Sequence, residues 1–267
     1  MLKIKDYYKA QSLEDAYKVL QEDDLNIIIA GGAWLKQNNK QVNKAIDITL
    51  IGLNEIIATD TAIEIGAMAS LRQIQISDLV KQQCNGILSE AINHIMGVGI
   101  RNIATLGGSV MGKYAFSDLF TPLLVMDASL VFYKKGEMSV TEFLNTKKME
   151  KDILIKIVLP KNNGIGYFHK VQKTRLDFAV VNVAISKNEL FDIAIGARPS
   201  IAKRPIKAIE FLNKQTKITE AIIKETSKIA IEELKFSTNS KSSSEYRMLV
   251  AATYLKRGLK EVMSNES

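Results

Sequence analysis

Residues 101–110, Arg-Asn-Ile-Ala-Thr-Leu-Gly-Gly-Ser-Val, contain a glycine pair between two hydroxyl residues. Gly107 and Gly108 leave backbone N–H groups uncovered by side chains, and such groups bind phosphate oxygens. Thr105 and Ser109 add hydroxyl donors on either side of this glycine pair. The stretch therefore predicts a phosphate-binding loop.

An acceptor group follows a few residues later, in Ser-Asp-Leu at residues 117–119. The Asp118 carboxylate can accept hydrogen bonds from sugar or polyol hydroxyls, which a site for phosphate alone does not need. The same residue would equally suit a helix N-cap ahead of Leu119, so both interpretations stay open at this point.

A second glycine pair lies about 75 residues earlier, in Ile-Ile-Ala-Gly-Gly-Ala-Trp-Leu at residues 28–35. The apolar run at 26–30 is typical of a buried parallel strand that ends in a βα turn. A strand that leads through Gly31-Gly32 into a helix would present free N–H groups to an anion. Such a turn is more often structural, but two glycine segments could hold one diphosphate from both sides.

Two other nucleotide-binding motifs do not fit the sequence. Gly107 and Gly112-Lys113 match Gly-x4-Gly-Lys, but Tyr114 follows where the phosphate loop needs Ser or Thr to hold magnesium. The strand that this motif requires would be residues 123–127, which follow Lys113 too closely for a helix and a crossover. Neither glycine segment reads Gly-x-Gly-x-x-Gly, so a Rossmann dinucleotide site is not indicated.

The residues that bind metals are scarce. Cys84 is the single cysteine, so this chain alone can build no disulfide and no cysteine-ligated iron–sulfur cluster. We expect Cys84 to be a small structural residue in a helical stretch over 74–91. His94 and His169 are the two histidines, and we expect both to be structural. A redox metal that works with this protein would therefore lie on a partner.

Composition suggests an ordinary globular protein. The chain has 267 residues, enough for two or three compact units. Its net charge of +7 comes from scattered lysines and arginines, which does not indicate nucleic-acid binding. The first six residues lack the apolar core of a secretory signal, and the apolar runs are too short to span a bilayer. The expected location is the cytoplasm.

The remaining patterns predict an α+β architecture. Ser12 and Asp15 predict the start of a helix, residues 45–48 a second buried strand, and residues 63–67 a half-exposed antiparallel strand. Further strands are expected at 130–133, 153–159, 178–185 and 190–196, the last two as a hairpin. The last third is expected to be helical, with apolar faces formed by Ile218, Ala221, Ile222 and Ile229 and by Tyr246, Leu249, Val250 and Tyr254.

Together these motifs resemble the molybdopterin dehydrogenase FAD-binding family, the flavoprotein subunits of enzymes of the xanthine dehydrogenase and carbon monoxide dehydrogenase type. Residues 30–35 resemble the family's Gly-Gly-Thr-Asp-Leu element, and residues 101–109 with 117–119 resemble its second signature. Residues 168–181 resemble the start of its C-terminal domain, and residues 244–247 the element before its last helix. The resemblance covers nearly the whole chain in the right order.

This resemblance implies a fold of the vanillyl-alcohol oxidase and para-cresol methylhydroxylase type. An FAD-binding domain at 1–160 would consist of two α/β subdomains, at about 1–55 and 56–160. A C-terminal domain of antiparallel sheet and helices would occupy 161–267. Asp118 would bind hydroxyls of the FAD chain, Leu154 would pack against a ring of the cofactor, and Lys170 would lie near the isoalloxazine. The pyrophosphate would be held by the backbone of Ile29, Ala30, Gly31, Gly32, Ala33 and Trp34 and of Thr105, Gly107, Gly108 and Ser109.

The sequence departs from the family pattern at three places. Ala33 and Trp34 stand where Thr and Asp are usual, Ser109 stands where Asn is common, and residues 113–116 lack the usual Ala-Ser-Pro. The affinity for FAD or its orientation would change, while phosphate binding through the backbone would survive.

The function that the resemblance implies is electron transfer. A molybdenum–pterin centre on a large subunit would oxidise the substrate, and two [2Fe–2S] clusters on a small subunit would pass electrons to FAD on this chain. NAD or another acceptor would then take them. The alternatives are a stand-alone FAD-dependent oxidoreductase of the same fold and a flavin-free scaffold subunit. We expect no general acid or base in this chain, and its substrate cannot be read from the sequence.

Overall fold

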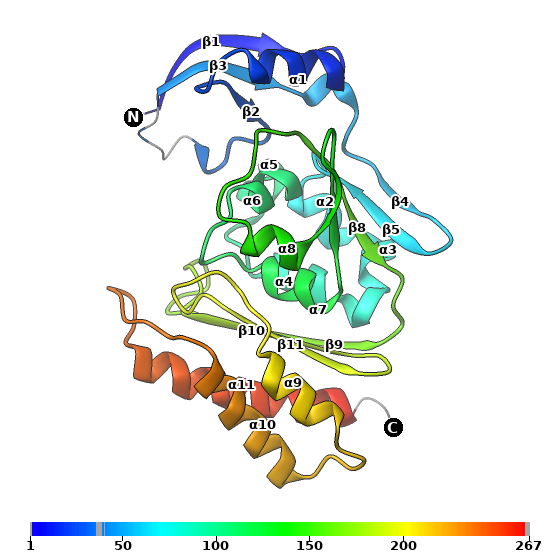
Figure 1. The fold of residues 1–267 in the computed structure, drawn as a ribbon, viewed down its shortest axis with the longest axis vertical. Helices are drawn as coiled ribbons and strands as arrows, with labels where there is room; N and C mark the ends of the chain where they lie inside the picture. Colours follow the sequence, from blue (N-terminus) through cyan, green and yellow to red (C-terminus); the bar gives the residue numbers. More distant parts are fainter. Residues whose placement is uncertain (1, 36–38, 40, 265–267) are drawn as a thin grey trace. The chain divides into compact units, whose positions relative to one another are not determined.

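The computed structural model describes residues 2–35, 39 and 41–264 (Figure 1). Two compact units can be distinguished. Unit 1 comprises residues 1–74, 97–112 and 129–159, and unit 2 comprises residues 75–96, 113–128 and 160–267. In the part of the chain that is described, no helix is long and apolar enough to cross a membrane.

Unit 1 begins with a three-stranded parallel sheet in the order β1-β3-β2, with one helix packed against it. Ser12 caps that helix, because its hydroxyl accepts a hydrogen bond from the backbone N–H of Asp15 at 3.1 Å. The predicted helix start and both parallel strands are confirmed. These elements are β1 (Lys3–Lys9), α1 (Leu13–Gln21), β2 (Ile27–Ile29) and β3 (Gln41–Asp47).

The prediction that residues 26–30 are buried is wrong in part. β2 is an edge strand, and its three isoleucines are half-buried. Its neighbour β3 lies in the centre of the sheet and buries Val42, Ala45 and Ile46. A continuous apolar run therefore does not distinguish a central parallel strand from an edge strand. The helix expected after Gly31-Gly32 falls largely outside the described residues.

The second part of unit 1 is a five-stranded sheet in the order β4-β5-β8-β6-β7. β5 buries Ala62, Ile63 and Ile65, while Glu64 is half-exposed and forms an ion pair with Lys156 at 2.7 Å. The predicted alternation is thus confirmed. The strands are β4 (Ile56–Ala58), β5 (Ala62–Gly66), β6 (Ser129–Phe132), β7 (Gly136–Ser139) and β8 (Leu154–Pro160), and nearby helical elements are η2 (Thr49–Ile51), α2 (Leu71–Ile76), α5 (Val98–Ile103), α6 (Leu106–Met111) and α8 (Val140–Asn145).

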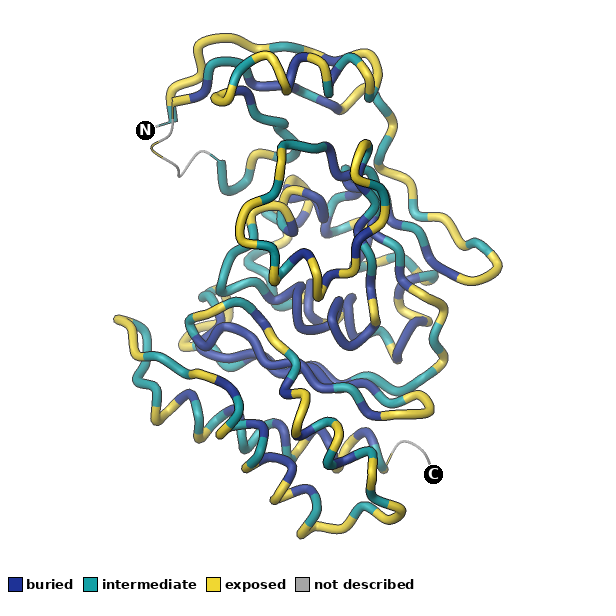
Figure 2. The backbone as a smooth tube through the Cα atoms, in the orientation of Figure 1, coloured by how far each residue is buried: buried dark blue, intermediate teal, exposed yellow. Residues whose placement is uncertain are grey.

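Unit 2 is built on an antiparallel sheet in the order β11-β10-β9. Helices cover both faces, with α9, α10 and α11 on one side and α4 and α7 on the other, so the central strand β10 is buried almost throughout (Figures 1 and 2). The elements are α3 (Asp78–Lys81), η3 (Gln83–Gly86), α4 (Ile87–Asn93), α7 (Phe120–Val125), β9 (Ile165–Val171), β10 (Val181–Lys187), β11 (Phe191–Gly196), α9 (Ile206–Asn213), α10 (Glu220–Glu233) and α11 (Ser244–Ser264).

The expected hairpin is present, but its first strand begins at Val181 rather than at Phe178. The edge strand β9, which precedes the hairpin, was not predicted. Gly166, His169 and Lys170 interrupt the apolar pattern of β9, so its periodicity is weak. In the structure it pairs along its whole length with β10.

Two helical predictions are corrected. The predicted face of α11 is right for Val250 and Tyr254, which are half-buried against the core, but wrong for Tyr246 and Leu249. The fully buried face is formed by residues around Ala251, Leu255 and Leu259. Tyr246 is 49% exposed and Leu249 is 65% exposed.

The expected helical stretch over 74–91 is helical over much of its length, but it is not one helix. It is broken at Cys84 and Asn85, whose φ angles are +44° and +53°. Four short elements, α2, α3, η3 and α4, take its place.

Candidate functional site

The structure brings the two glycine segments of unit 1 together. A Cβ at Gly31 would lie 1.6 Å from the carbonyl oxygen of Ile103, so only glycine allows this approach of the two backbones. A Cβ at Gly108 would lie 3.7 Å from the Cβ of Ala30. The two glycine segments, about 75 residues apart in the chain, are thus neighbours. This proximity is required if both are to contact one diphosphate.

The first glycine segment offers free hydrogen-bond donors. Among the described residues, the backbone N–H groups of Gly31, Gly32 and Ala33 donate to no other group. Gly32 has a φ of +65°, a conformation that favours glycine, and no described atom lies within 4 Å of the position that its Cβ would take. Within the described residues, this loop therefore has amides without a partner, and such amides can bind an anion.

The second glycine segment uses its donors internally. The N–H of Leu106 donates to Ala69 and that of Gly107 to Ala67, each at 2.9 Å, while the N–H of Gly108 donates to the Thr105 hydroxyl at 3.2 Å. The Ser109 hydroxyl donates to the Thr105 carbonyl at 2.8 Å. The amides of residues 106–108 are therefore paired within the protein, and Gly108 is the exposed member of the glycine pair.

The other predicted residues of the first glycine segment are half-buried. Ile29 ends β2, Ala30 follows it, and Ala33 and Trp34 lie in the turn beyond. Leu154 begins β8 and is 5% exposed, which places its side chain in the core of unit 1.

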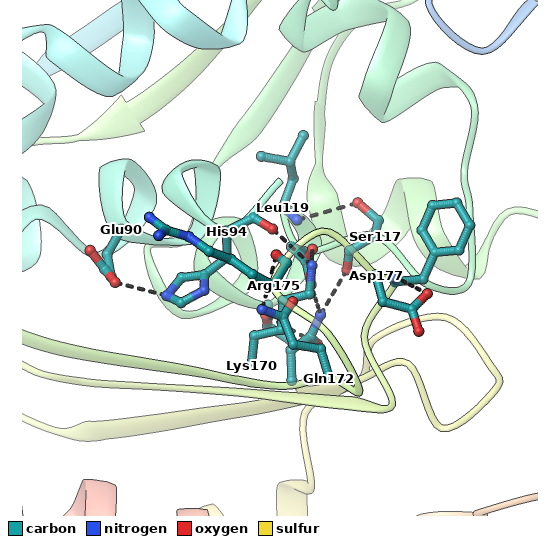
Figure 3. Close-up of polar contacts among 12 residues, drawn as sticks. Glu90, His94, Ser117, Leu119, Lys170, Gln172, Arg175 and Asp177 are labelled. Carbon is teal, nitrogen blue, oxygen red and sulfur yellow. Dashed lines mark hydrogen bonds and ion pairs between the residues drawn. The ribbon is translucent and has the colours of Figure 1, made fainter. Parts of the chain in front are cut away.

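In unit 2, the structure pairs Asp118 with Lys170. The two side chains form an ion pair at 2.8 Å, with side-chain exposures of 6% and 2%. The Lys170 ammonium also donates to the His94 carbonyl at 2.9 Å (Figure 3). Lys170 is therefore a buried, partnered cation. Asp118 makes no N-cap bond to α7, so that interpretation of it is wrong.

Asn182 completes the surroundings of the Asp118 carboxylate. Its side-chain amide donates to Oδ1 of Asp118 at 2.8 Å and to the carbonyl of Ser117 at 3.1 Å. Burial raises the pKa of the Asp118 carboxyl, and the Lys170 ammonium and the Asn182 amide oppose this rise. Sequence reasoning missed Asn182, because only the register between β9 and β10 places it beside Lys170.

The remaining candidates have structural roles in the described chain. The ring of His94 contacts Glu90 at 2.9 Å, and His169 stacks on Tyr254 with ring centroids 3.6 Å apart. Cys84 is buried, and burial raises the pKa of its thiol to about 11, so the thiol is protonated at neutral pH. No group of three metal-binding side chains occurs among the described residues.

The structure also removes the basis of the phosphate-loop motif. Residues 123–125, which would have to be a β-strand, lie in the helix α7.

Comparison with known families settles what kind of chain this is. Residues 2–162 match the family described as the FAD binding domain in molybdopterin dehydrogenase. Residues 166–262 match the family of the CO dehydrogenase flavoprotein C-terminal domain. The chain belongs to this flavoprotein family. It is an FAD-binding subunit of an oxidoreductase of the molybdenum hydroxylase type, and the alternative of a stand-alone enzyme is not favoured.

Individual relatives agree with this family. The chain is 24% identical to the glyceraldehyde dehydrogenase medium chain of Sulfolobus acidocaldarius, over 96% of this chain and 97% of that protein. It is 32% identical over 130 residues to the xanthine dehydrogenase FAD-binding subunit of Escherichia coli O157:H7, which covers 46% of this chain and 44% of that one.

Solved structures confirm the predicted fold. A chain of the carbon monoxide dehydrogenase from Hydrogenophaga pseudoflava matches with a TM-score of 0.88 at 21% identity, covering 97% of both chains. A chain of quinoline 2-oxidoreductase from Pseudomonas putida 86 matches with a TM-score of 0.87 at 23% identity and the same coverage.

The residues of this flavoprotein fit FAD. The amides of Gly31, Gly32 and Ala33 have no partner among the described residues and suit a pyrophosphate, and the positive φ of Gly32 turns the loop without a Cβ in the way. Asp118 has two bonds in the structure, while a carboxylate can accept about four. It retains acceptor capacity for hydroxyl groups.

Proposed function

We propose that this flavoprotein subunit passes electrons from [2Fe–2S] clusters of a small partner subunit, through FAD, to NAD or another acceptor. A large molybdenum-binding subunit would be the third component and would oxidise the substrate. The observation that carries the proposal is the first glycine loop, which combines unpaired amides with close contact to a second glycine segment. The single buried cysteine agrees with a chain that leaves the metal clusters to its partners.

Bound FAD supplies the electron-transfer chemistry, and the residues of this chain bind and orient it. We propose that the amides of Gly31, Gly32 and Ala33 hold the pyrophosphate, with Ile29, Ala30 and Trp34 forming the surrounding loop. The second segment then limits the space for the phosphates through Gly108, and Thr105, Gly107 and Ser109 hold that segment in shape.

In unit 2 we propose that Asp118 accepts hydrogen bonds from hydroxyls of the FAD chain. Lys170 fixes the charge of this carboxylate, because its ammonium lies 2.8 Å away. Its cation would also favour negative charge on a nearby flavin. Leu154 would offer an apolar contact to a ring of the cofactor.

We also propose that residues 1–160 and 161–267 are the two domains of the chain, since the two family matches meet between residues 162 and 166. A cytoplasmic location remains a prediction from the sequence.

Metal analysis of the native complex tests this function. The chain, carrying an affinity tag, is purified from its own cells under mild conditions, and FAD, molybdenum and iron are quantified. We expect all three, with iron in excess over molybdenum because each small subunit carries two iron–sulfur clusters. A preparation that contains FAD but neither metal would support the stand-alone enzyme instead.

A further inference from the structure

One row of residues crosses the antiparallel sheet of unit 2. Lys170 on β9 lies directly opposite Asn182 on β10, and Asn182 lies directly opposite Gly196 on β11. Residues in such a row project from the same face of the sheet. The row therefore places a cation, an amide and a residue without a side chain next to one another.

The first two members of the row hold the Asp118 carboxylate from two sides. The ammonium of Lys170 contacts Oδ2 and the amide of Asn182 donates to Oδ1, both at 2.8 Å. The second N–H of Asn182 donates to the carbonyl of Ser117 at 3.1 Å, which ties the same loop to the sheet. Asn182 itself is fully buried.

The third member makes room for the amide. A Cβ at Gly196 would lie 2.3 Å from Oδ1 of Asn182, closer than real contacts allow. On its other side, the Thr121 hydroxyl lies 3.5 Å from the same oxygen and can donate to it. The orientation of Asn182 is thus set by its neighbours, with both N–H groups directed at residues 117 and 118.

We propose that Asn182 is a positioning residue for FAD, which holds the Asp118 carboxylate so that its remaining lone pairs face hydroxyls of the cofactor. This inference rests on the proposed function. Hydrogen bonds to a charged group are stronger than neutral ones, and loss of one leaves the carboxylate both less fixed and less readily ionised. Lys170 and His94 are the other charged or titratable groups that act on this carboxylate.

The first test compares Asn182→Leu with wild type by titrating FAD into the full-length chain after removal of its flavin. Leucine keeps the approximate volume but donates no hydrogen bond, so we expect the Kd for FAD to rise about tenfold. Ser186→Ala is the matched control. Its hydroxyl is also buried on β10 and donates to the Val125 carbonyl at 2.7 Å, but it does not contact Asp118. We expect its Kd to stay within about twofold of wild type, whatever its stability.

The second test keeps the shape of the side chain and uses pH. Asn182→Asp places a second carboxyl against Asp118, and at neutral pH the two negative charges repel each other. We expect FAD binding to be weakened most at alkaline pH and to recover as the pH falls, because one shared proton then restores a donor to Asp118. The free energy of unfolding of this variant is followed over the same pH range, and a purely structural role would make the affinity change only where the variant unfolds.

The outcomes separate this inference from the proposed function. If wild type binds FAD and both Asn182 variants bind it equally well, the positioning role is wrong and the proposed function stands. If wild type binds no FAD, the proposed function itself fails. If Asn182→Leu does not fold, the pH profile of Asn182→Asp decides, and a flat profile parallel to wild type overturns the role.

Discussion

Among single residues, Gly108 tests cofactor binding, because a Cβ there would lie 3.7 Å from Ala30 on the first glycine segment and 3.0 Å from the Thr105 hydroxyl. Gly108→Val would place a branched side chain between the two glycine segments, beside Ala30. We expect a loss of FAD affinity of about ten- to a hundredfold from the steric conflict, which equals about 1–3 kcal/mol. Titration with FAD measures it.

Gly99→Val is the control, because a Cβ there would meet no described atom within 4 Å. It should bind FAD as wild type does. Equal affinity of the Gly108→Val chain would show that the pyrophosphate does not lie against this segment.

A second prediction concerns Lys170 and how the free energy of unfolding depends on pH. Lys170→Met would leave the Asp118 carboxylate buried without its ammonium, at a cost of about 3–5 kcal/mol at neutral pH. Burial already raises the pKa of this carboxyl above its ordinary value of 3.8, and removal of the cation raises it further. A carboxyl with a raised folded-state pKa favours folding when protonated. The loss in free energy of unfolding caused by Lys170→Met should therefore be smallest near pH 3.8. It should grow as the pH rises through the folded-state pKa of Asp118.

Denaturant unfolding at several pH values checks this dependence. Lys156→Met, which breaks the half-exposed pair with Glu64, is the control and should cost about 1 kcal/mol or less. A deficit for Lys170→Met that is the same at every pH would contradict the assigned pairing.

At the scale of elements, α11 shows which face of a helix carries the core. Leu255 is fully buried, whereas Leu249 is 65% exposed. Leu255→Ala should lower the free energy of unfolding by about 2–5 kcal/mol, and Leu249→Ala by about 0.5 kcal/mol or less. Denaturant unfolding of the two variants measures the difference. Similar losses in free energy of unfolding would show that Leu249 also lies on the packed face of α11, as the sequence predicted.

The error in that expectation has a physical cause. Tyr246 and Leu249 are large apolar residues at helical spacing, while the buried face of α11 also includes the small residues Ala251 and Gly258. A Cβ at Gly258 would lie 2.4 Å from the ring of Tyr167, so close packing selects glycine there. Hydropathy patterns favour large side chains and overlook such contacts. The apolar runs of two strands, the hairpin and the Ser12 cap were predictable, because each is indicated by residues near one another in the chain.

At the scale of the whole molecule, the unpredictable part lies in contacts between distant segments. The sequence suggested phosphate binding at both glycine pairs, but only the structure shows that Gly31 packs on Ile103 and that the second segment satisfies its own amides. The compact units also combine distant stretches, such as 75–96 and 160–267 in unit 2. The partners of Lys170 come from two such stretches, so its burial could not be read from the sequence.

The visible absorption spectrum of the purified chain shows whether it binds FAD. The cofactor released on denaturation is then identified by chromatography and mass spectrometry. We expect the two absorption bands of an oxidised flavin and release of FAD at about one molecule per chain. A colourless chain that takes up no added FAD would contradict this expectation.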